Sequence, residues 1–224
     1  MAPWIDVVLI FPELFDAPLR TSLLGRAVSS GLLEVGVHDL RAHGLGKHRS
    51  VDDEPYGGGP GMVMRPEPIF EAVDALRADT SHVILLSPRG ARLDHASVAR
   101  LAGHEHLILI CGRFEGVDER VAQHCADEEI SIGDYVLAGG ELAALVVVEA
   151  VSRMIPGVLG NEASLAEESH TAGDFEYPQY TRPAEFRGLP VPDVLLSGDH
   201  GRIEEWRRTE AARATRSRRP DLSG

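Results

Sequence analysis

Four short apolar runs, rich in β-branched residues, constrain the fold of this 224-residue chain more than any other feature. They read "IDVVLIF" (5–11), "VGVHDL" (35–40), "VILLSP" (83–88) and "LILICG" (107–112). Runs of this length and composition are typical of buried strands. A fifth run, "EISIGDYVL" (129–137), has the pattern of a half-buried strand.

Helical patterns separate these runs. The periodicity predicts helices at roughly 18–31, 67–78, 94–103, 117–125 and 140–155, and the last of them ends at the stop signal Pro156-Gly157. Strands that alternate with helices predict an α/β fold with a mainly parallel sheet, and a chain of this length can bury a substantial core. Ligands of such folds bind outside the carboxyl ends of the strands.

The character of the sequence changes after Gly157, where it becomes polar and rich in Gly, Pro, Ser and Thr. We therefore expect a main domain over 1–159, a flexible linker over 160–173 and a small helical domain over 174–224. The small domain contains one predicted helix at about 200–217. No internal repeat is visible.

Composition is that of an ordinary globular protein, with 43% hydrophobic and 25% charged residues. No apolar run approaches the roughly 18 residues of a membrane span. The amino terminus lacks a basic region and begins directly with a strand pattern, so we expect a mature protein without a signal peptide. The two cysteines, Cys111 and Cys125, form no CxxC motif. These features favour a cytoplasmic protein without a membrane partner.

The net charge of −13 argues against a nucleic-acid partner. The charge is uneven, however: from residue 182 onward nine Arg oppose seven acids, which is +2, and leaves 13 basic and 28 acidic residues, or −15, for 1–181. The tail "WRRTEAARATRSRRP" contains six of those arginines. It is either a solvated helix face or a local phosphate contact.

Several familiar catalytic motifs are absent from the sequence. There is no GxxxxGK[ST] P-loop, and neither "GLGKHR" (44–49) nor "GGGPGM" (57–62) is a GxGxxG dinucleotide fingerprint. Zinc-ligand spacings, HExxH and GxSxG are also missing. Phosphoryl, hydride and metal-dependent chemistry therefore lose support, and we assign no metal ligands.

Glycine-containing loops fall where strands are expected to end. "DDEPYGGGPGMVM" (52–64) is either a tight surface loop or a concave, backbone-rich surface to which Asp52, Asp53 and Tyr56 add polar contacts. "CGRFEGVDERV" (111–121) is either a well-made connection from strand to helix or a ligand contact at Gly112 and Glu115.

Together with "SPRG" (87–90) and "IGDYVLAGG" (132–140), these loops would build a site from backbone and acids. The whole chain has one lysine, Lys47, whereas a phosphate-rich cofactor would call for cations. Adenosine attached to a sulfonium amino acid suits a glycine-lined, weakly acidic pocket.

Six motifs occur in a specific order: "PYGGGPGM", "CGRFEGVDER", "SIGDYVLAGGE", "IPGVLGNEAS", "YPQYTRP" and "VLLSGDH…I…WRR". In this order they resemble the bacterial tRNA (guanine-N1)-methyltransferases of the TrmD type, in the SPOUT class, over nearly the whole chain. The resemblance implies an α/β fold with a deep C-terminal trefoil knot, a rare exception to unknotted topology. It also implies a homodimer with active sites at the interface and a helical C-terminal domain that helps to hold tRNA.

The reaction implied by the resemblance is methyl transfer from S-adenosylmethionine to N1 of the guanine 3′ of the anticodon, at tRNA position 37. The implied cofactor-binding residues are Leu86, Ser87, Pro88, Gly112, Glu115, Ile132, Gly133, Asp134, Tyr135, Val136, Leu137, Gly139 and Gly140. The implied substrate-binding residues are Asp52, Tyr56, Gly58, Gly59, Arg202, Arg207 and Arg208. The family reaction is helped by Mg²⁺, for which this sequence has no motif.

Guanine N1 carries a proton, so a general base must remove it, and a fixed cation should stabilise the charge that develops on O6. Arg153 matches the family's arginine for the second role. Glu168 in "AEESH" occupies the place where the family usually has Asp, which makes the side chain one methylene longer, and Glu167 is an adjacent rival. We expect the linker to order only when tRNA and cofactor are both bound.

A second departure is Asp199 in "SGDH", where the family more often has a neutral or basic residue. Two other functions remain open at this point. One is a related knotted methyltransferase that acts on a ribose 2′-OH of another RNA. The other is a non-enzymatic module that binds RNA or adenosine.

Overall fold

The structure, a computed structural model, describes residues 3–160 and 175–222. The chain forms two compact units, Met1–Gly160 and Asn161–Gly224. Apart from Gly160, the linker predicted over 160–173 lies outside the described residues, as do Glu167 and Glu168. Within the part of the chain that the structure describes, no helix is long and apolar enough to cross a membrane.

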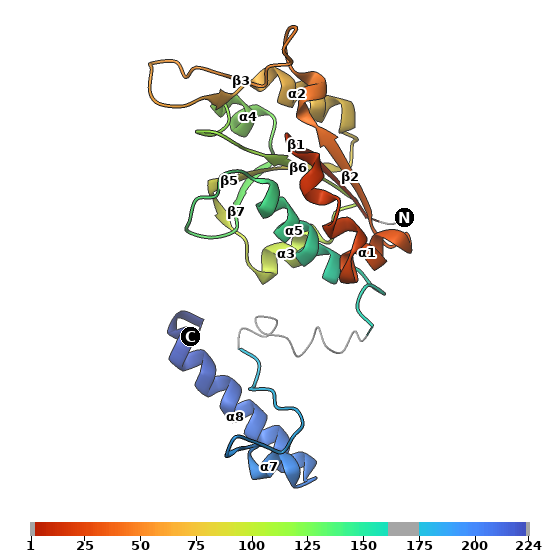
Figure 1. The fold of residues 1–224 in the computed structure, drawn as a ribbon, viewed down its shortest axis with the longest axis vertical. Helices are drawn as coiled ribbons and strands as arrows, with labels where there is room; N and C mark the ends of the chain where they lie inside the picture. Colours follow the sequence, from red (N-terminus) through yellow and green to blue (C-terminus); the bar gives the residue numbers. More distant parts are fainter. Residues whose placement is uncertain (1–2, 161–174, 223–224) are drawn as a thin grey trace. The chain divides into compact units, whose positions relative to one another are not determined.

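A five-stranded sheet with the order β2-β1-β6-β5-β7 forms the centre of the first unit (Figure 1). All of its strand pairs are parallel. The strands are β1 (Trp4–Leu9), β2 (Glu34–Asp39), β5 (Ser81–Arg92), β6 (His106–Cys111) and β7 (Glu128–Ser131). The predicted α/β architecture with a mainly parallel sheet is therefore confirmed.

Helices cover both faces of this sheet. One face packs against α1 (Ser22–Ser29), α3 (His95–Leu101) and α5 (Glu141–Arg153), and the other against α2 (Pro66–Leu76) and α4 (Glu119–His124) (Figure 1). Strand alternation divides the core between the faces. In β1, for example, Val7 and Leu9 belong to the first cluster and Val8 to the second.

Several predicted boundaries were wrong. The helix expected over 18–31 begins only at Ser22, because Thr21 is extended (φ −120°, ψ 156°) and a short 3-10 helix, η2 (Pro18–Arg20), precedes it. The strand expected over 129–137 ends at Ser131. Beyond it Gly133 has φ 156° and accepts a hydrogen bond from the Tyr135 amide, so the chain turns instead of extending.

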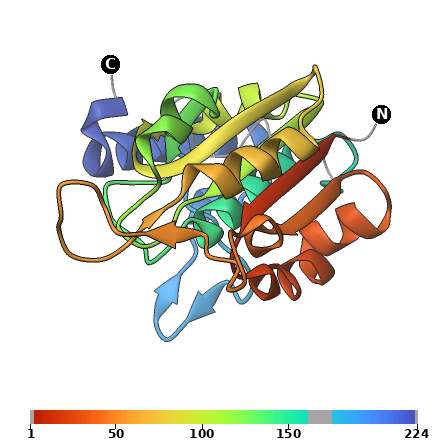
Figure 2. The same ribbon diagram turned by 90° about the horizontal axis from the view of Figure 1, so that it is seen from above.

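Short elements without a strong sequence pattern complete the first unit. They are η1 (Pro12–Phe15), η3 (Leu40–His43) and the two-residue strands β3 (Asp52–Asp53) and β4 (Val63–Met64). β3 and β4 pair antiparallel, and the glycine-rich loop between them projects from the unit (Figure 2).

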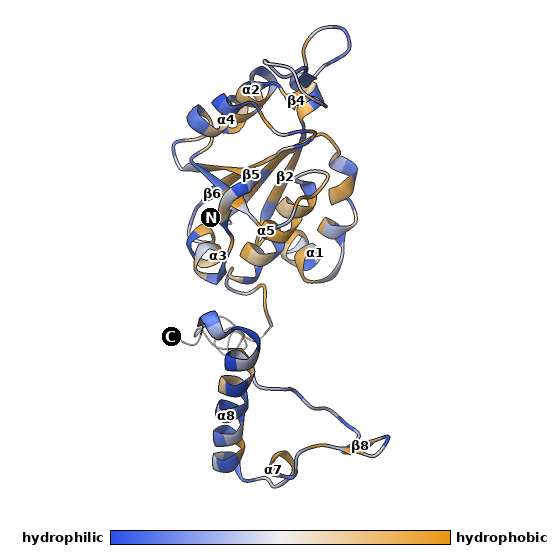
Figure 3. Ribbon diagram, turned by 90° about the vertical axis from the view of Figure 1, so that its left-hand side faces the viewer, coloured by the Kyte–Doolittle hydropathy of each residue, from blue (hydrophilic) through white to orange (hydrophobic). Residues whose placement is uncertain are grey.

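The second unit contains the hairpin of β8 (Glu185–Phe186) and β9 (Leu189–Pro190), then α7 (Asp193–Leu196), α8 (His200–Arg218) and η4 (Pro220–Leu222). The helix predicted at about 200–217 is confirmed by α8, which is coloured mostly hydrophilic in Figure 3. Asp199 caps this helix, since its carboxylate accepts a hydrogen bond from the Arg202 amide at 3.1 Å.

Candidate active site

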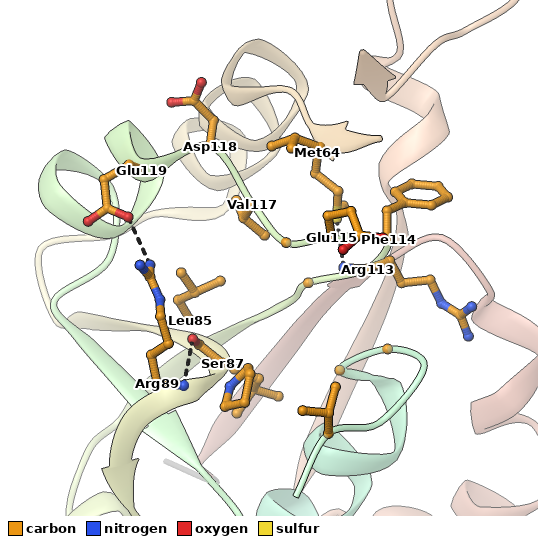
Figure 4. Close-up of a pocket in the computed structure, with 18 of the residues that line it drawn as sticks. Met64, Leu85, Ser87, Arg89, Arg113, Phe114, Glu115, Val117, Asp118 and Glu119 are labelled. Atoms are coloured by element: carbon orange, nitrogen blue, oxygen red, sulfur yellow. Dashed lines mark hydrogen bonds and ion pairs between the residues drawn. The ribbon is translucent and has the colours of Figure 1, made fainter. Parts of the chain in front are cut away.

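A cavity of about 1130 Å³ opens at the carboxyl ends of β5, β6 and β7 (Figure 4). Its walls come from residues 53–57, 63–67, 85–89, 112–120, 130–132 and 135–140, together with Ala143. This is the edge of the sheet at which α/β proteins bind ligands.

Most of the residues predicted to bind the cofactor line this cavity: Leu86, Ser87, Pro88, Gly112, Glu115, Ile132, Tyr135, Val136, Leu137, Gly139 and Gly140. Gly133 and Asp134 belong to the same loop as Ile132 but do not line it. Of the predicted substrate-binding residues, Tyr56 lines the cavity, whereas Asp52, Gly58 and Gly59 are its neighbours along the chain.

An irregularity in β5 forms one wall. The pairing of β5 with β7 shifts register between Leu86 and Ala91, so the residues between them leave the regular ladder. Within this segment the Arg89 amide donates to Ser87 Oγ at 3.2 Å. A Cβ at Gly90 would lie 2.5 Å from the backbone of Glu129 and Ile130, which shows how tightly the displaced segment packs on β7.

A close backbone approach forms the floor of the cavity. The Gly140 amide donates to the Gly112 carbonyl at 2.8 Å, and Arg113 and Gly139 form an antiparallel bridge. A Cβ at Gly140 would lie 2.8 Å from Cys111 Cα and 3.0 Å from Gly112 N. The close passage of the chain predicted at Gly139-Gly140 is therefore present, and backbone atoms alone exclude a side chain at Gly140.

Apolar side chains from the loop after β7 stand open to solvent. Tyr135, Val136 and Leu137 are 56%, 81% and 38% exposed, although they follow a strand that is buried at its end. Exposed apolar residues gathered in one loop beside a cavity suit a ligand or another protein surface.

The glycine-rich loop between β3 and β4 forms the opposite side. Gly57, Gly58, Gly59 and Gly61 all have positive φ values, between 75° and 137°, which other residues adopt only with strain. The Glu115 amide donates to the Met62 carbonyl at 2.9 Å, which ties this loop to the β6–α4 connection.

Acidic residues outnumber arginines among the residues that line the cavity, and three ion pairs form at its rim. Arg65 pairs with Asp53 at 2.7 Å, Arg89 with Glu119 at 2.8 Å, and Arg120 with Asp118 at 2.8 Å. Hydrogen bonds from Arg89 and Arg120 hold the pKa values of Glu119 and Asp118 below their ordinary values. Glu119 and Asp118 therefore stay ionised at neutral pH.

Arg89 and Glu119 were not singled out from the sequence. Their positions in the sequence could have identified them, because "SPRG" and the start of α4 both follow buried strands. The part-buried pair of Arg113 and Glu141, joined at 2.9 Å at the cavity floor, was also missed, because its partners lie 28 positions apart in the sequence.

Of the two predicted catalytic residues, the structure describes only Arg153. Arg153 ends α5, at the far end of the helix from Gly140, and it does not line the cavity. Glu168 lies outside the described residues. Arg202, Arg207 and Arg208 belong to α8 in the second unit, where the Arg207 guanidinium lies 4.5 Å from the centre of the Tyr177 ring.

Among the described residues no group of three or more His, Cys, Asp or Glu could hold a metal ion. The Mg²⁺ that the resemblance implies therefore has no ligand set in these parts of the chain.

Comparison with known proteins gives one consistent result. Residues 3–224 match the family model described as tRNA (Guanine-1)-methyltransferase TrmD. Relatives named tRNA (guanine-N(1)-)-methyltransferase include proteins from Anaeromyxobacter sp. strain Fw109-5, 59% identical over 222 residues, and Dictyoglomus turgidum, 56% identical over 218. A third, from Geobacter sulfurreducens, is 52% identical over 219 residues. Each alignment covers 97% of this chain and 89% of the relative. The chain therefore belongs to the TrmD family of tRNA (guanine-1)-methyltransferases, as its six ordered motifs predicted.

Proposed function

We propose that this protein is a tRNA (guanine-N1)-methyltransferase that acts in the cytoplasm. Its substrates are S-adenosylmethionine and a tRNA with guanine 3′ of the anticodon, at position 37. The observation that carries the proposal is the glycine-walled cavity at the carboxyl ends of β5, β6 and β7, in a chain that belongs to this family throughout its length.

The cavity fits a cofactor that combines adenosine with a cationic amino acid. Its volume of about 1130 Å³ is generous for one such molecule, and the glycines at 112, 139 and 140 leave this part of the wall without side chains. Leu86, Leu137 and Ala143 add apolar surface for a planar base. Glu115, which is exposed in the wall, suits a hydroxyl or ammonium group. S-adenosylmethionine supplies the methyl group as an electrophile.

The protein has two chemical tasks in this reaction. Glu168 accepts the proton of guanine N1, because the protonated nitrogen has no free lone pair for the methyl group. Arg153 stabilises the negative charge that then develops on O6. A glutamate does the work of the family's usual aspartate if the linker seats it about one methylene further back.

The position of Arg153 supports a shared active site in a homodimer. Twelve residues of helix separate it from Glu141 beside the cavity, a distance of about 18 Å along the axis. It therefore serves the cavity of a second copy rather than its own. Leu142 and Val146, one turn apart on α5, are 54% and 46% exposed and give that copy an apolar surface to cover.

The fold itself is proposed to be the SPOUT type with a trefoil knot. Supporting this, the loop after β7 crosses the end of β6 at van der Waals distance, with hydrogen bonding between Gly140 and Gly112. The second unit is proposed to hold tRNA through Arg202, Arg207 and Arg208, on the arginine-rich helix α8.

The test is single-turnover transfer of a labelled methyl group from S-adenosylmethionine to a tRNA transcript. Wild type is compared with Glu168→Ala and with the matched control Glu167→Ala, and a transcript with adenine at position 37 serves as the substrate control. We expect guanine-dependent transfer to N1, which falls by at least about a hundredfold in Glu168→Ala alone.

Other outcomes have definite meanings. Transfer lost in Glu167→Ala and kept in Glu168→Ala would move the base by one residue. Nucleoside analysis that finds a methylated ribose would replace guanine N1 by a 2′-OH. Binding of cofactor and tRNA with no transfer would contradict the enzymatic function.

A further inference from the structure

At the floor of the cavity, Arg113 and Glu141 form a part-buried ion pair. Arg113 Nε donates to Glu141 Oε1 at 2.9 Å. The Glu141 side chain is 2% exposed and that of Arg113 is 24% exposed. Burying a carboxylate costs free energy unless a positively charged partner compensates it. Removing Arg113 would therefore leave the Glu141 charge buried without compensation.

Other interactions also fix Arg113. Its amide donates to Met64 Sδ at 3.0 Å, and its guanidinium lies 4.4 Å from the centre of the Phe11 ring. Figure 4 shows the side chain leaving the wall and pointing away from the cavity. The backbone of Arg113 therefore forms part of the cavity wall, while its side chain contacts Glu141 and Phe11.

The pair joins the two segments whose close approach forms the floor. Arg113 follows Gly112 at the end of β6, and Glu141 is the first residue of α5, directly after Gly140. The hydrogen bond between Gly140 and Gly112 lies between them. The ion pair therefore links the side chains of the same two segments that the backbone hydrogen bond joins.

This geometry explains why position 139 is a glycine. A Cβ there would lie 2.4 Å from Glu141 Oε2 and 2.5 Å from Arg113 Nε. The glycine makes room for the ion pair, whereas Gly140 makes room for the backbone of Cys111. The two adjacent glycines thus avoid steric clashes with different neighbours.

We propose that Arg113 and Glu141 are positioning residues that hold the Gly112 and Gly139-Gly140 walls at the separation the cofactor requires. They set cofactor affinity without touching the cofactor. The inference rests on the proposed function, which names S-adenosylmethionine as the ligand. The competing role is a contribution to folding alone.

The experiment measures cofactor affinity, transfer rate and stability for the same set of variants. Glu141→Gln keeps the shape and one acceptor but removes the charge, Gly139→Ala pushes the pair apart, and Arg113→Ala with Glu141→Ala completes a double-mutant cycle. Glu105→Gln is the matched control, since Glu105 is exposed and is not among the residues lining the cavity.

We expect Glu141→Gln and Gly139→Ala to raise the Kd for S-adenosylmethionine, measured by calorimetry, by at least about tenfold, because walls displaced by a fraction of an ångström no longer fit the cofactor. The single-turnover rate of Glu141→Gln at saturating cofactor should stay within about twofold of wild type, and the double alanine variant should bind the cofactor no more weakly than the weaker-binding single alanine variant. Glu105→Gln should match wild type.

Three results would overturn the inference. One is an unchanged Kd with a lower urea midpoint, which would assign the pair to folding. Another is a slower transfer step at unchanged Kd. A third is strict additivity of the two alanine variants in cofactor binding. Failure of the wild type to bind S-adenosylmethionine would instead contradict the proposed function, so the two failures are distinguishable.

Discussion

Gly140 is a position at which the cavity tolerates little change. The nearest neighbours of an added Cβ would be backbone atoms of Cys111 and Gly112, at 2.8 and 3.0 Å, and backbone cannot rotate aside as a side chain can. A single methyl group there must separate the end of β6 from the start of α5.

Gly140→Ala is therefore expected to lower the free energy of unfolding by about 1–3 kcal/mol and to weaken cofactor binding. Urea unfolding and calorimetry would measure the two effects. Gly160→Ala is the control, because a Cβ at Gly160 meets nothing within 4 Å. Equal unfolding midpoints for the two variants would contradict the close approach.

We predict that the thiols of Cys111 and Cys125 react only slowly in the native state. Burial raises the pKa of the Cys125 thiol to about 11. The Cys111 pKa is also well above its ordinary value, because burial and then the charge of Glu141 oppose ionisation. Since the thiolate is the reactive form, alkylation at pH 8 should be at least about a hundredfold slower in the folded than in the urea-unfolded protein.

The raised pKa of Cys125 also determines how the stability of the native state changes with pH. The native state keeps thiol protons that the unfolded state releases above about pH 8.5, so stability is fully present below that pH and declines as pH rises toward 11. Urea midpoints at pH 7.5 and 10 measure the decline, which should be smaller in Cys125→Ala. Equal alkylation rates of native and unfolded protein would refute both statements.

At the scale of elements, the amino terminus of α8 explains why an acid, Asp199, precedes a helix that is proposed to bind tRNA. Asp199 accepts a hydrogen bond from the Arg202 amide at 3.1 Å and so satisfies a backbone donor that the helix itself cannot. The negative charge is incidental to this task, because the amide oxygen of asparagine would serve equally well.

Asp199→Ala should destabilise the second unit by about 1 kcal/mol through loss of the cap. Asp199→Asn removes the same charge and keeps the acceptor, so it should stay within a few tenths of a kcal/mol of wild type. Thermal unfolding followed by circular dichroism would compare them. If the asparagine variant lost as much stability as the alanine variant, the charge rather than the cap would matter.

At the scale of the whole molecule, positive charge is concentrated in one helix of a chain that is acidic overall. The chain has a net charge of −13, yet α8 contains Arg202, Arg207, Arg208, Arg213, Arg216 and Arg218. Arg207 stacks on Tyr177, whereas Arg202 and Arg208 are exposed, the latter with a loose 3.9 Å pair to Glu204. Arg202 and Arg208 are thus available for phosphate.

The variant Arg202→Ala/Arg208→Ala should weaken tRNA binding and flatten the dependence of log K on log salt by about one unit for each phosphate that is no longer bound. Filter binding across a salt series measures this slope. Arg26→Ala, an exposed arginine of α1, is the control. An unchanged slope would remove α8 from the tRNA interface, while cofactor binding should remain at the wild-type level in every case.

The sequence by itself determined the central sheet, its covering helices and the family. Buried strands and α8 carry their periodicity locally, and six ordered motifs needed no structure to be identified. Local pattern misled where glycine turned the chain, so the expected strand over 132–137 is a loop. Only the tertiary structure decided which residues meet. The Arg113–Glu141 pair and the steric requirement for glycine at position 139 depend on contacts between segments far apart in the chain. Hydrophobic periodicity contains no information about such contacts, because it reports which face of an element is buried and not what that face touches.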